Sequence, residues 1–196
     1  MSERVVDSAI AVIARDGLDA LSVRRVASQA GVAIGTVQHH YPTRAELVLA
    51  ALQRTADRQQ ARAMGTRRSS TLLGTLVSRL TSLLPHDDAS CEEAIVWVAL
   101  AAAAARDDLV GPHQRRIVAE SVAAIAALLD RATEADELPD HTDTGDLAER
   151  VHAVVDGYLL HTAASGTTIS PRAEAQFHST LAALFSDETG IGHTPC

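Results

Sequence analysis

Lysine is absent from the sequence, and aromatic side chains and cysteines are few. All 17 cationic residues are arginines, and aromatic residues make up 3% of the 196 positions. The two cysteines, Cys91 and Cys196, are too few for a disulfide framework in a chain of this length. This excludes the small disulfide-rich secreted class, and we expect a cytoplasmic chain with reduced thiols.

Long apolar runs are also missing. The first apolar stretch is interrupted by Arg15 and Asp16, which does not match a secretory signal peptide. The alanine-rich stretch over residues 94–105 is too short to span a bilayer. We therefore expect no membrane partner.

What the sequence does contain favours helices. Apolar residues make up 46% of the chain, with alanine and leucine prominent, and both are strong helix formers. Apolar positions recur at helical spacing, and no alternating strand pattern extends beyond four residues. We therefore predict an all-α fold of about nine helices. The predicted helices cover about 5–14, 22–30, 33–40, 43–64, 70–84, 90–106, 110–137, 144–164 and 171–185.

Charge is distributed unevenly along the chain. The net charge is −8. Residues 1–68 contain ten arginines and six acidic residues, whereas residues 69–196 contain seven arginines and 19 acidic residues. A small basic segment followed by an acidic one is typical of a protein whose first part binds phosphate groups.

The first three predicted helices have clear start and stop signals. Gly17 and Gly31 suit the left-handed position that ends a helix, and Ser22 suits an N-cap. Pro42 ends the third helix, and Thr43-Arg44-Ala45-Glu46 is a capping box that begins a fourth, long helix. Three short helices with a tight glycine-containing turn predict a helix-turn-helix, whose third helix enters the DNA major groove.

The string from Leu21 to Leu47 resembles the DNA-binding domain of the tetracycline-repressor (TetR) family. The resemblance covers roughly residues 5–50. Trp97 and the stretch 155–159 add a looser similarity to BetI-type members. The matching positions are Ala27, Ala30-Gly31-Val32, Gly35-Thr36-Val37, His40-Tyr41, Thr43-Arg44 and Glu46-Leu47.

The resemblance implies a function and a domain organisation. It implies a helix-turn-helix domain over residues 1–45 and a helical effector-binding and dimerisation domain over 46–187; we expect 188–196 to be a disordered tail. The implied partners are an operator in double-stranded DNA, a small-molecule effector and a second copy of the chain. The implied activity is repression by DNA binding, without a cofactor, although the sequence does not distinguish a repressor from an activator.

Arginines at helix starts support the DNA-binding interpretation. Arg24, Arg25 and Arg44 fall in the first turns of predicted helices, where a cation opposes the helix dipole. Their presence is explained if a phosphate binds at those helix ends. Solvated arginines are the alternative, and Arg24 is also suited to a guanine edge. The predicted DNA contacts are Ser22, Arg24, Arg25, Gly35, Thr36, Gln38, His39, His40 and Arg44.

Two positions depart from the family pattern, and one histidine has two interpretations. Gln38 replaces the usual tyrosine and is suited to pairing with adenine. Ala33 replaces the usual serine or threonine, which removes an N-cap worth about 1 kcal/mol. His40 is interpreted either as a phosphate contact or as a packing residue beside Tyr41.

Residues of the second domain are assigned to a pocket and to an interface. Trp97 is predicted either to pack in the core or to form a wall of the effector pocket. Apolar residues form stripes along the last two predicted helices. These apolar stripes fit a two-fold interface, as the family resemblance implies, and they also fit an intrachain core. The predicted pocket residues are Met64, Leu73, Leu76, Leu80, Trp97 and Leu128. The predicted interface residues are Val151, Val155, Tyr158, Leu159, Phe177, Leu181 and Leu184.

Other kinds of site are disfavoured. His152, His161 and His178 lack metal-binding spacing, and no metal site is expected. Cys91 is followed by two glutamates, which do not activate a thiol. No nucleophile elbow or phosphate-binding glycine loop occurs, so we expect no enzyme. The alternative function is a helical ligand-binding or protein-interaction module without DNA activity.

Overall fold

The computed structural model describes residues 2–186, and its regular structure is entirely helical in that range. This confirms the all-α prediction, with nine α-helices and one short 3-10 helix over the described residues. The predicted tail at 188–196 lies outside them. The elements are α1 Ser2–Asp16, η1 Leu18–Ala20, α2 Val23–Ala30, α3 Ile34–His40, α4 Arg44–Gly65, α5 Leu72–Thr81, α6 Asp88–Ala104, α7 Val110–Glu134, α8 Thr144–Ser165 and α9 Pro171–Ser186.

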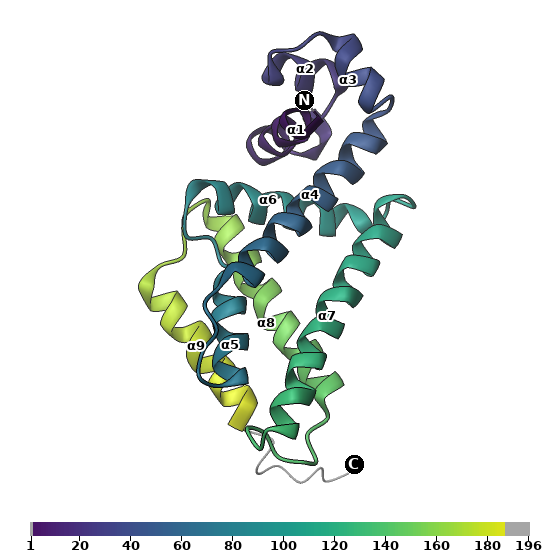
Figure 1. Cartoon of the computed structure of the whole chain (residues 1–196). Coiled ribbons are helices and arrows are strands. Elements are labelled where there is room, and N and C mark those ends of the chain that lie inside the picture. Colours follow the sequence, from purple (N-terminus) through teal and green to yellow (C-terminus); the bar gives the residue numbers. More distant parts are fainter. Residues whose placement is uncertain (1, 187–196) are drawn as a thin grey trace.

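Helices α1, α2 and α3 form a small N-terminal cluster, which we call the head (Figure 1). Their boundaries follow the predicted capping residues. The hydroxyl of Ser22 accepts a hydrogen bond from the backbone N–H of Arg25, and Gly31 is left-handed, with φ 64° and ψ 40°. Gly17 differs from the prediction, because its φ of 84° and ψ of 164° lie outside the left-handed helical region and it precedes η1 as the N-cap. Ala33 occupies the N-cap position of α3 and makes no side-chain cap bond, as expected for alanine.

Helix α4 connects the head with the remaining helices, which we call the body (Figure 1). It begins with the predicted capping box, in which Thr43 and Glu46 each bond the backbone N–H of the other. The domain boundary expected between residues 45 and 46 falls in the first turn of this continuous helix. Head and body are therefore joined by one uninterrupted helix.

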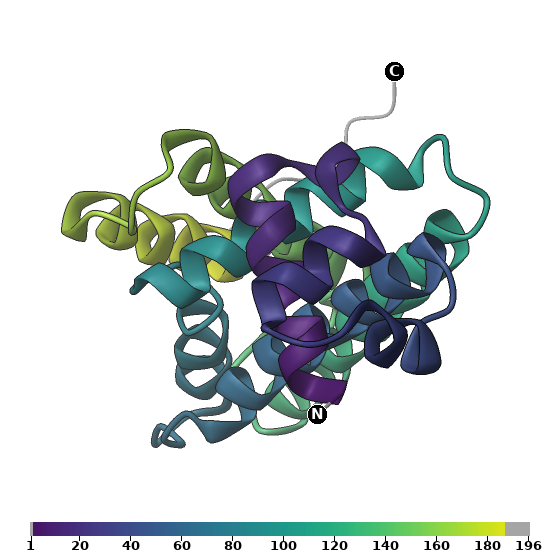
Figure 2. The same cartoon turned by 90° about the horizontal axis from the view of Figure 1, so that it is seen from above.

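The body consists of α5–α9. Helix α8 packs against α6 and α7, and α9 packs against α8 and α5. Helix α1 of the head packs on α6, so that one continuous apolar core joins head and body. Figure 2, which views the molecule from above, shows α1 crossing the body beneath α2 and α3. None of the helices in residues 2–186 is both long and apolar enough to cross a membrane.

Helix α7 ends three residues earlier than predicted, and the cause is a tertiary contact. Asp136 adopts a φ of 57°, which terminates the helix. The carboxylate of Glu137 then accepts hydrogen bonds from the backbone N–H groups of Leu72 and Leu73, at 2.7 and 2.8 Å. These groups begin α5, where an anion is favoured by the helix dipole. Helix α5 is also shorter than predicted at both ends.

Candidate nucleic-acid interface and ligand cavity

Helix α3 has one buried and one exposed face. Val37 is fully buried against the head, whereas Gly35, Gln38 and His39 are exposed. A Cβ atom added to Gly35 would meet nothing within 4 Å, so another molecule can approach the backbone closely there. Thr36 is partly buried. The exposed face therefore brings together side chains that were predicted to contact DNA.

Ile34, the first residue of α3, was not among the predicted DNA contacts. Its side chain is 46% exposed, on the same short helix as Gln38. An apolar side chain at this place suits the methyl group of thymine in the major groove. The sequence signal was present, because a bulky apolar residue stands at the start of the proposed recognition helix.

His39 and His40 are both exposed, which disagrees with a packing role for His40. Their rings lie edge to face with centroids 5.2 Å apart, and the centroid of His40 lies 6.5 Å from that of Tyr41. Tyr41 is the partly buried member of this group, and its hydroxyl hydrogen-bonds Ser2 at 2.7 Å. Both histidines are thus available at the end of α3 for an external partner.

The three arginines predicted at helix starts have different surroundings. Arg25 lies 3.3 Å from the carboxylate of Asp16, which also pairs with Arg15 at 2.8 Å. The hydrogen bond from Arg15 lowers the pKa of Asp16. Arg24 is exposed and forms no ion pair within residues 2–186. Ser22 serves as the N-cap of α2. Of these side chains, Arg24 is the least engaged within the chain.

Arg44 has an intramolecular role that the sequence analysis did not predict. Its guanidinium donates hydrogen bonds to the backbone carbonyls of Leu21, at 3.0 Å, and Leu18, at 2.8 Å. These carbonyls belong to the segment between α1 and α2. Arg44 therefore fastens the first turn of α4 to the head, and this intramolecular role explains a cation at an otherwise unfavourable helix position.

A cavity of about 230 Å³ lies in the body between α4, α5, α6, α7 and α8. Five of the six predicted pocket residues line it, and Leu73 does not. Leu73 lies one helical turn before Leu76, where the start of α5 is joined to Glu137 instead. Trp97 is buried in the core and also forms part of the cavity wall, so core packing and a place in the cavity wall are compatible. The five lining residues are Met64, Leu76, Leu80, Trp97 and Leu128.

The apolar cavity wall contains a polar group that was not among the predicted pocket residues. The indole N–H of Trp97 donates to a carboxylate oxygen of Asp156 at 3.1 Å, and Nδ1 of His152 lies 3.5 Å from the other oxygen. Asp156 stands within the apolar stripe of α8, one residue after Val155. That interruption of the stripe was the available signal.

The predicted interface residues lie mainly in the core of one chain. The structure therefore corrects the prediction for Val151, Val155, Leu159, Phe177 and Leu181, which are at most 4% exposed and cannot reach a second chain. Tyr158 and Leu184 are partly buried, and the ring of Tyr158 packs edge to face on Phe177. The stripes thus hold α8 and α9 to their own chain.

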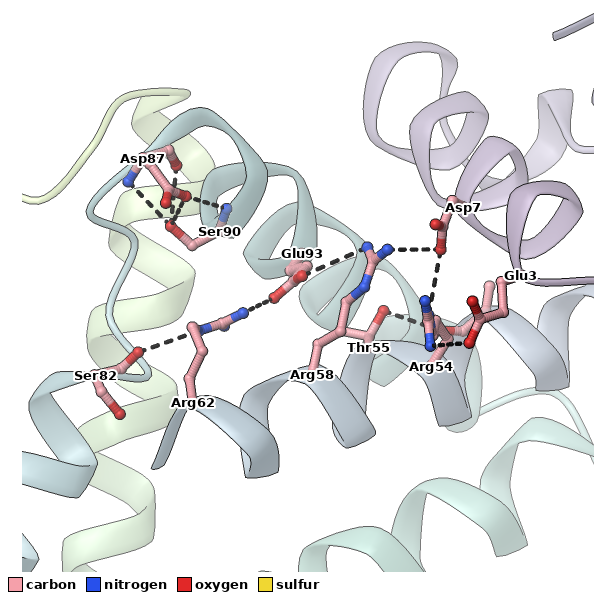
Figure 3. Close-up of polar contacts among 11 residues, drawn as sticks. Glu3, Asp7, Arg54, Thr55, Arg58, Arg62, Ser82, Asp87, Ser90 and Glu93 are labelled. Atoms are coloured by element: carbon pink, nitrogen blue, oxygen red, sulfur yellow. Dashed lines mark hydrogen bonds and ion pairs between the residues drawn. The ribbon is translucent and has the colours of Figure 1, made fainter. Parts of the chain in front are cut away.

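An arginine ladder on α4 joins the head to the body (Figure 3). Its three members, Arg54, Arg58 and Arg62, are four residues apart and so share one face of the helix. Arg54 pairs with Glu3 and Asp7 of α1, each at 3.3 Å. Arg58 also pairs with Asp7, at 2.6 Å.

The same ladder continues into the body. Arg58 lies 3.6 Å from the carboxylate of Glu93 on α6, and Arg62 pairs with that carboxylate as well. Nε of Arg62 donates to the backbone carbonyl of Ser82 at 3.3 Å, just beyond α5. Glu93 is 3% exposed, and its ion pairs with these two arginines compensate for its burial away from water.

The remaining reactive side chains do not form a common site. Within the described residues, no three potential metal ligands gather. His178 hydrogen-bonds Thr81, and His152 faces Asp156. Burial and the nearby Asp88 and Asp87 raise the pKa of Cys91, which disfavours the reactive thiolate.

Comparison with known proteins agrees with this geometry. Residues 5–51 match the family described as bacterial regulatory proteins, tetR family. Residues 74–186 match the family described as BetI-type transcriptional repressor, C-terminal. The chain is 26% identical to the HTH-type transcriptional regulator PksA of Bacillus subtilis over 160 residues, which are 81% of this chain and 77% of PksA.

Solved structures resemble the whole chain. A transcriptional regulator from Rhodococcus sp. Rha1 is 28% identical, with a TM-score of 0.82 over 97% of this chain and 98% of that one. A putative TetR-family regulator from Rhodococcus sp. is 25% identical, with a TM-score of 0.84 over 95% and 100% of the two chains.

Proposed function

Because the chain belongs to the tetR family of bacterial regulatory proteins and is a DNA-binding transcriptional regulator, we propose that it is a repressor released by a small molecule. The released state forms when the molecule enters the body cavity. We assign the protein no catalytic step. We propose that the protein acts in the cytoplasm, where bacterial DNA is located.

The exposed face of α3 is the observation that carries the proposal. Its buried side is fixed by Val37, so Ile34, Gln38 and His39 are presented outward on a supported helix. In a helix-turn-helix such a face lies in the major groove and reads base edges. In this proposal Ile34 and Gln38 contact base edges. Arg24 and His40 contact phosphates or a neighbouring base.

Arg25 and Arg44 have a different place in this proposal. Each is engaged within the chain, Arg25 with Asp16 and Arg44 with two backbone carbonyls. Their positive charges still lie near α3, while their side chains primarily hold the geometry of the head. Thr36, Gly35 and Ser22 contribute by close approach of the helix ends to the DNA backbone.

A two-fold dimer is part of the proposal, because one short helix reads few bases and two heads reach successive turns about 34 Å apart. The exposed side of α8 supports an interface. Leu160 is 52% exposed there, Ala153 and Ala164 are exposed, and a Cβ atom at Gly157 would meet nothing within 4 Å. Small residues permit close helix packing, so this side replaces the buried stripe as the assigned interface.

Helix α4 is the proposed route from cavity to head. One side lines the cavity through Ala56, Ala63 and Met64. The arginine ladder on α4 holds α1 of the head and α6 of the body through Asp7 and Glu93. A ligand that favours a shifted α4 thereby favours a different head position, which is a population shift between two states.

An electrophoretic mobility assay with the DNA upstream of its own gene tests the proposal. A shift at modest salt that weakens as salt rises is expected, since phosphate contacts release counterions. Absence of any shift, with a dimer present, would leave the helical ligand-binding or interaction module as the better description.

A further inference from the structure

The cavity lining has an unusual distribution of charge for an apolar space. Asp57, Glu120 and Asp156 contribute three carboxylates, whereas Arg79 is the single arginine in the lining. His152 adds a group that is charged only when protonated. A cavity with this lining is more favourable to a cation than to an anion.

The two outer carboxylates lie at the mouth, between α4 and α7. Asp57 and Glu120 are exposed, and Asp57 accepts a hydrogen bond from Gln53 at 2.8 Å. Glu120 pairs with Arg116 at 2.9 Å, which compensates its charge. Arg116 also donates to Gln53 at 3.0 Å and so joins the two helices. The mouth is therefore polar, and Asp57 has no arginine partner in the described chain.

The inner carboxylate lies among apolar side chains. Asp156 is flanked on α8 by Val155 and Leu159, which are almost fully buried. One indole N–H and one histidine nitrogen are its polar contacts in the described chain. Neither supplies a permanent positive charge, yet the carboxylate side chain is 42% exposed. A ligand in the cavity can therefore reach this carboxylate, and a positive charge beside it is favourable.

Trp97 adds a second attraction for the same kind of ligand. The indole lines the cavity next to Asp156, and an aromatic face attracts a positive charge. Because its N–H is bonded to the carboxylate, the ring is held beside it. Arg79 is the competing group, but it lies in the last turn of α5, where its charge is favoured by the helix dipole.

We propose that the cavity binds an amphipathic organic cation, such as an ammonium with an apolar arm, whose charge lies beside the carboxylate of Asp156 and near the indole of Trp97. The inference rests on the proposed function only in naming this ligand as the effector. The apolar arm fills the space lined by Leu76, Leu80 and Leu128, and Asp57 attracts the cation to the mouth.

Trp97 is the only tryptophan of the chain, so its fluorescence reports binding directly. The probes are benzyltrimethylammonium, neutral benzyl alcohol and anionic phenylacetate, which share a phenyl group and differ in charge. We expect saturable fluorescence change with the cation at an affinity about tenfold or more above the other two. Equal affinities, a preference for phenylacetate, or no response to any probe would overturn the proposal.

Substitutions test which side chain of the cavity binds the positive charge of the ligand. Asp156→Asn keeps an oxygen that accepts from Trp97 and removes the charge, so cation binding is expected to weaken about tenfold. Glu149→Gln is the matched control, because Glu149 is exposed on the same helix outside the cavity. Unchanged cation binding in Asp156→Asn would contradict the assignment, and loss of phenylacetate binding in Arg79→Met would show an anion site instead.

The same probe separates this inference from the proposed function. If benzyltrimethylammonium binds but leaves the mobility of the protein–DNA complex unchanged, the cation site is supported, and the proposal that this ligand releases the protein from DNA is contradicted. If the protein binds DNA but does not bind the cation, its function as a DNA-binding regulator is supported and the cation site is contradicted.

Discussion

The guanidinium of Arg58 lies 3.6 Å from the buried carboxylate of Glu93, while it also holds Asp7 at 2.6 Å. One side chain of α4 thus contacts both α1 of the head and α6 of the body. Arg62 is the second partner of Glu93. The relative position of head and body consequently depends on charges that are partly removed from water, where removal of either partner leaves an unfavourable charge behind.

Arg58→Met is expected to lower the free energy of unfolding by about 1–3 kcal/mol, because it removes ion pairs with two carboxylates, one of which is buried. Urea unfolding measures this change. Amide hydrogen exchange is expected to rise in α1 more than in α9. Arg67→Met is the control, since Arg67 is exposed beyond α4, and an equal effect of both substitutions would refute the special role of Arg58.

Arg44→Ala and Arg24→Ala are expected to act differently on DNA binding. Arg24→Ala removes an exposed cation and lowers the salt slope by about one unit for each phosphate that the arginine neutralises. Arg44→Ala removes two hydrogen bonds to carbonyls and is expected mainly to lower the thermal stability of the head. Titrations at several salt concentrations, with thermal melts, measure both. Identical salt slopes for the two variants would contradict this division.

Ile34 is expected to read a thymine methyl group. The tightest duplex selected from a random library by the wild-type chain is remade with deoxyuridine at each thymine in turn. In each half-site, one of these single replacements is expected to weaken binding about fourfold. This factor corresponds to the free energy of burying one methyl group. Ile34→Ala must then be insensitive to that replacement. If no thymine methyl affects the wild-type affinity, Ile34 does not read a base.

Leu160→Glu is expected to dissociate the dimer, because the two-fold operation places two like charges in one apolar contact. The dissociation constant is expected to rise about a hundredfold, and sedimentation equilibrium measures it. Ala127→Glu on the exposed side of α7 is the control for added charge. A dimer of Leu160→Glu with unchanged affinity would show that the interface lies elsewhere.

Ala33→Ser is expected to stabilise the protein by about 1 kcal/mol. Ala33 already has the extended backbone of an N-cap, with φ −66° and ψ 146°, and lacks only the side-chain acceptor. Chemical denaturation measures the gain. Ala61→Ser, at an exposed interior position of α4, is expected to be slightly destabilising instead. A loss of stability in Ala33→Ser would mean that α3 is not limited by its cap.

The order of the helices and the exposed face of α3 could be predicted because they depend on neighbouring residues. Ser22, Gly31 and Thr43 act within one helical turn, and their effects hold in any tertiary setting. Five of the predicted pocket residues line the cavity because the family resemblance implies a pocket among the central helices, where apolar side chains gather. Helical spacing did not show whether an apolar face meets a cavity or solid core, which is why Leu73 was misplaced.

The sequence by itself determined an all-helical chain, the excess of arginine in residues 1–68, the helix caps and the short helix α3, because these follow from composition and from contacts a few residues apart. Only the tertiary structure decided which charged and polar groups meet. Arg44 with Leu18, Arg58 with Glu93 and Trp97 with Asp156 are pairs that lie 26 to 59 residues apart in the sequence. Such pairs arise when apolar faces pack and bring distant helices together, and spacing along the chain does not encode them.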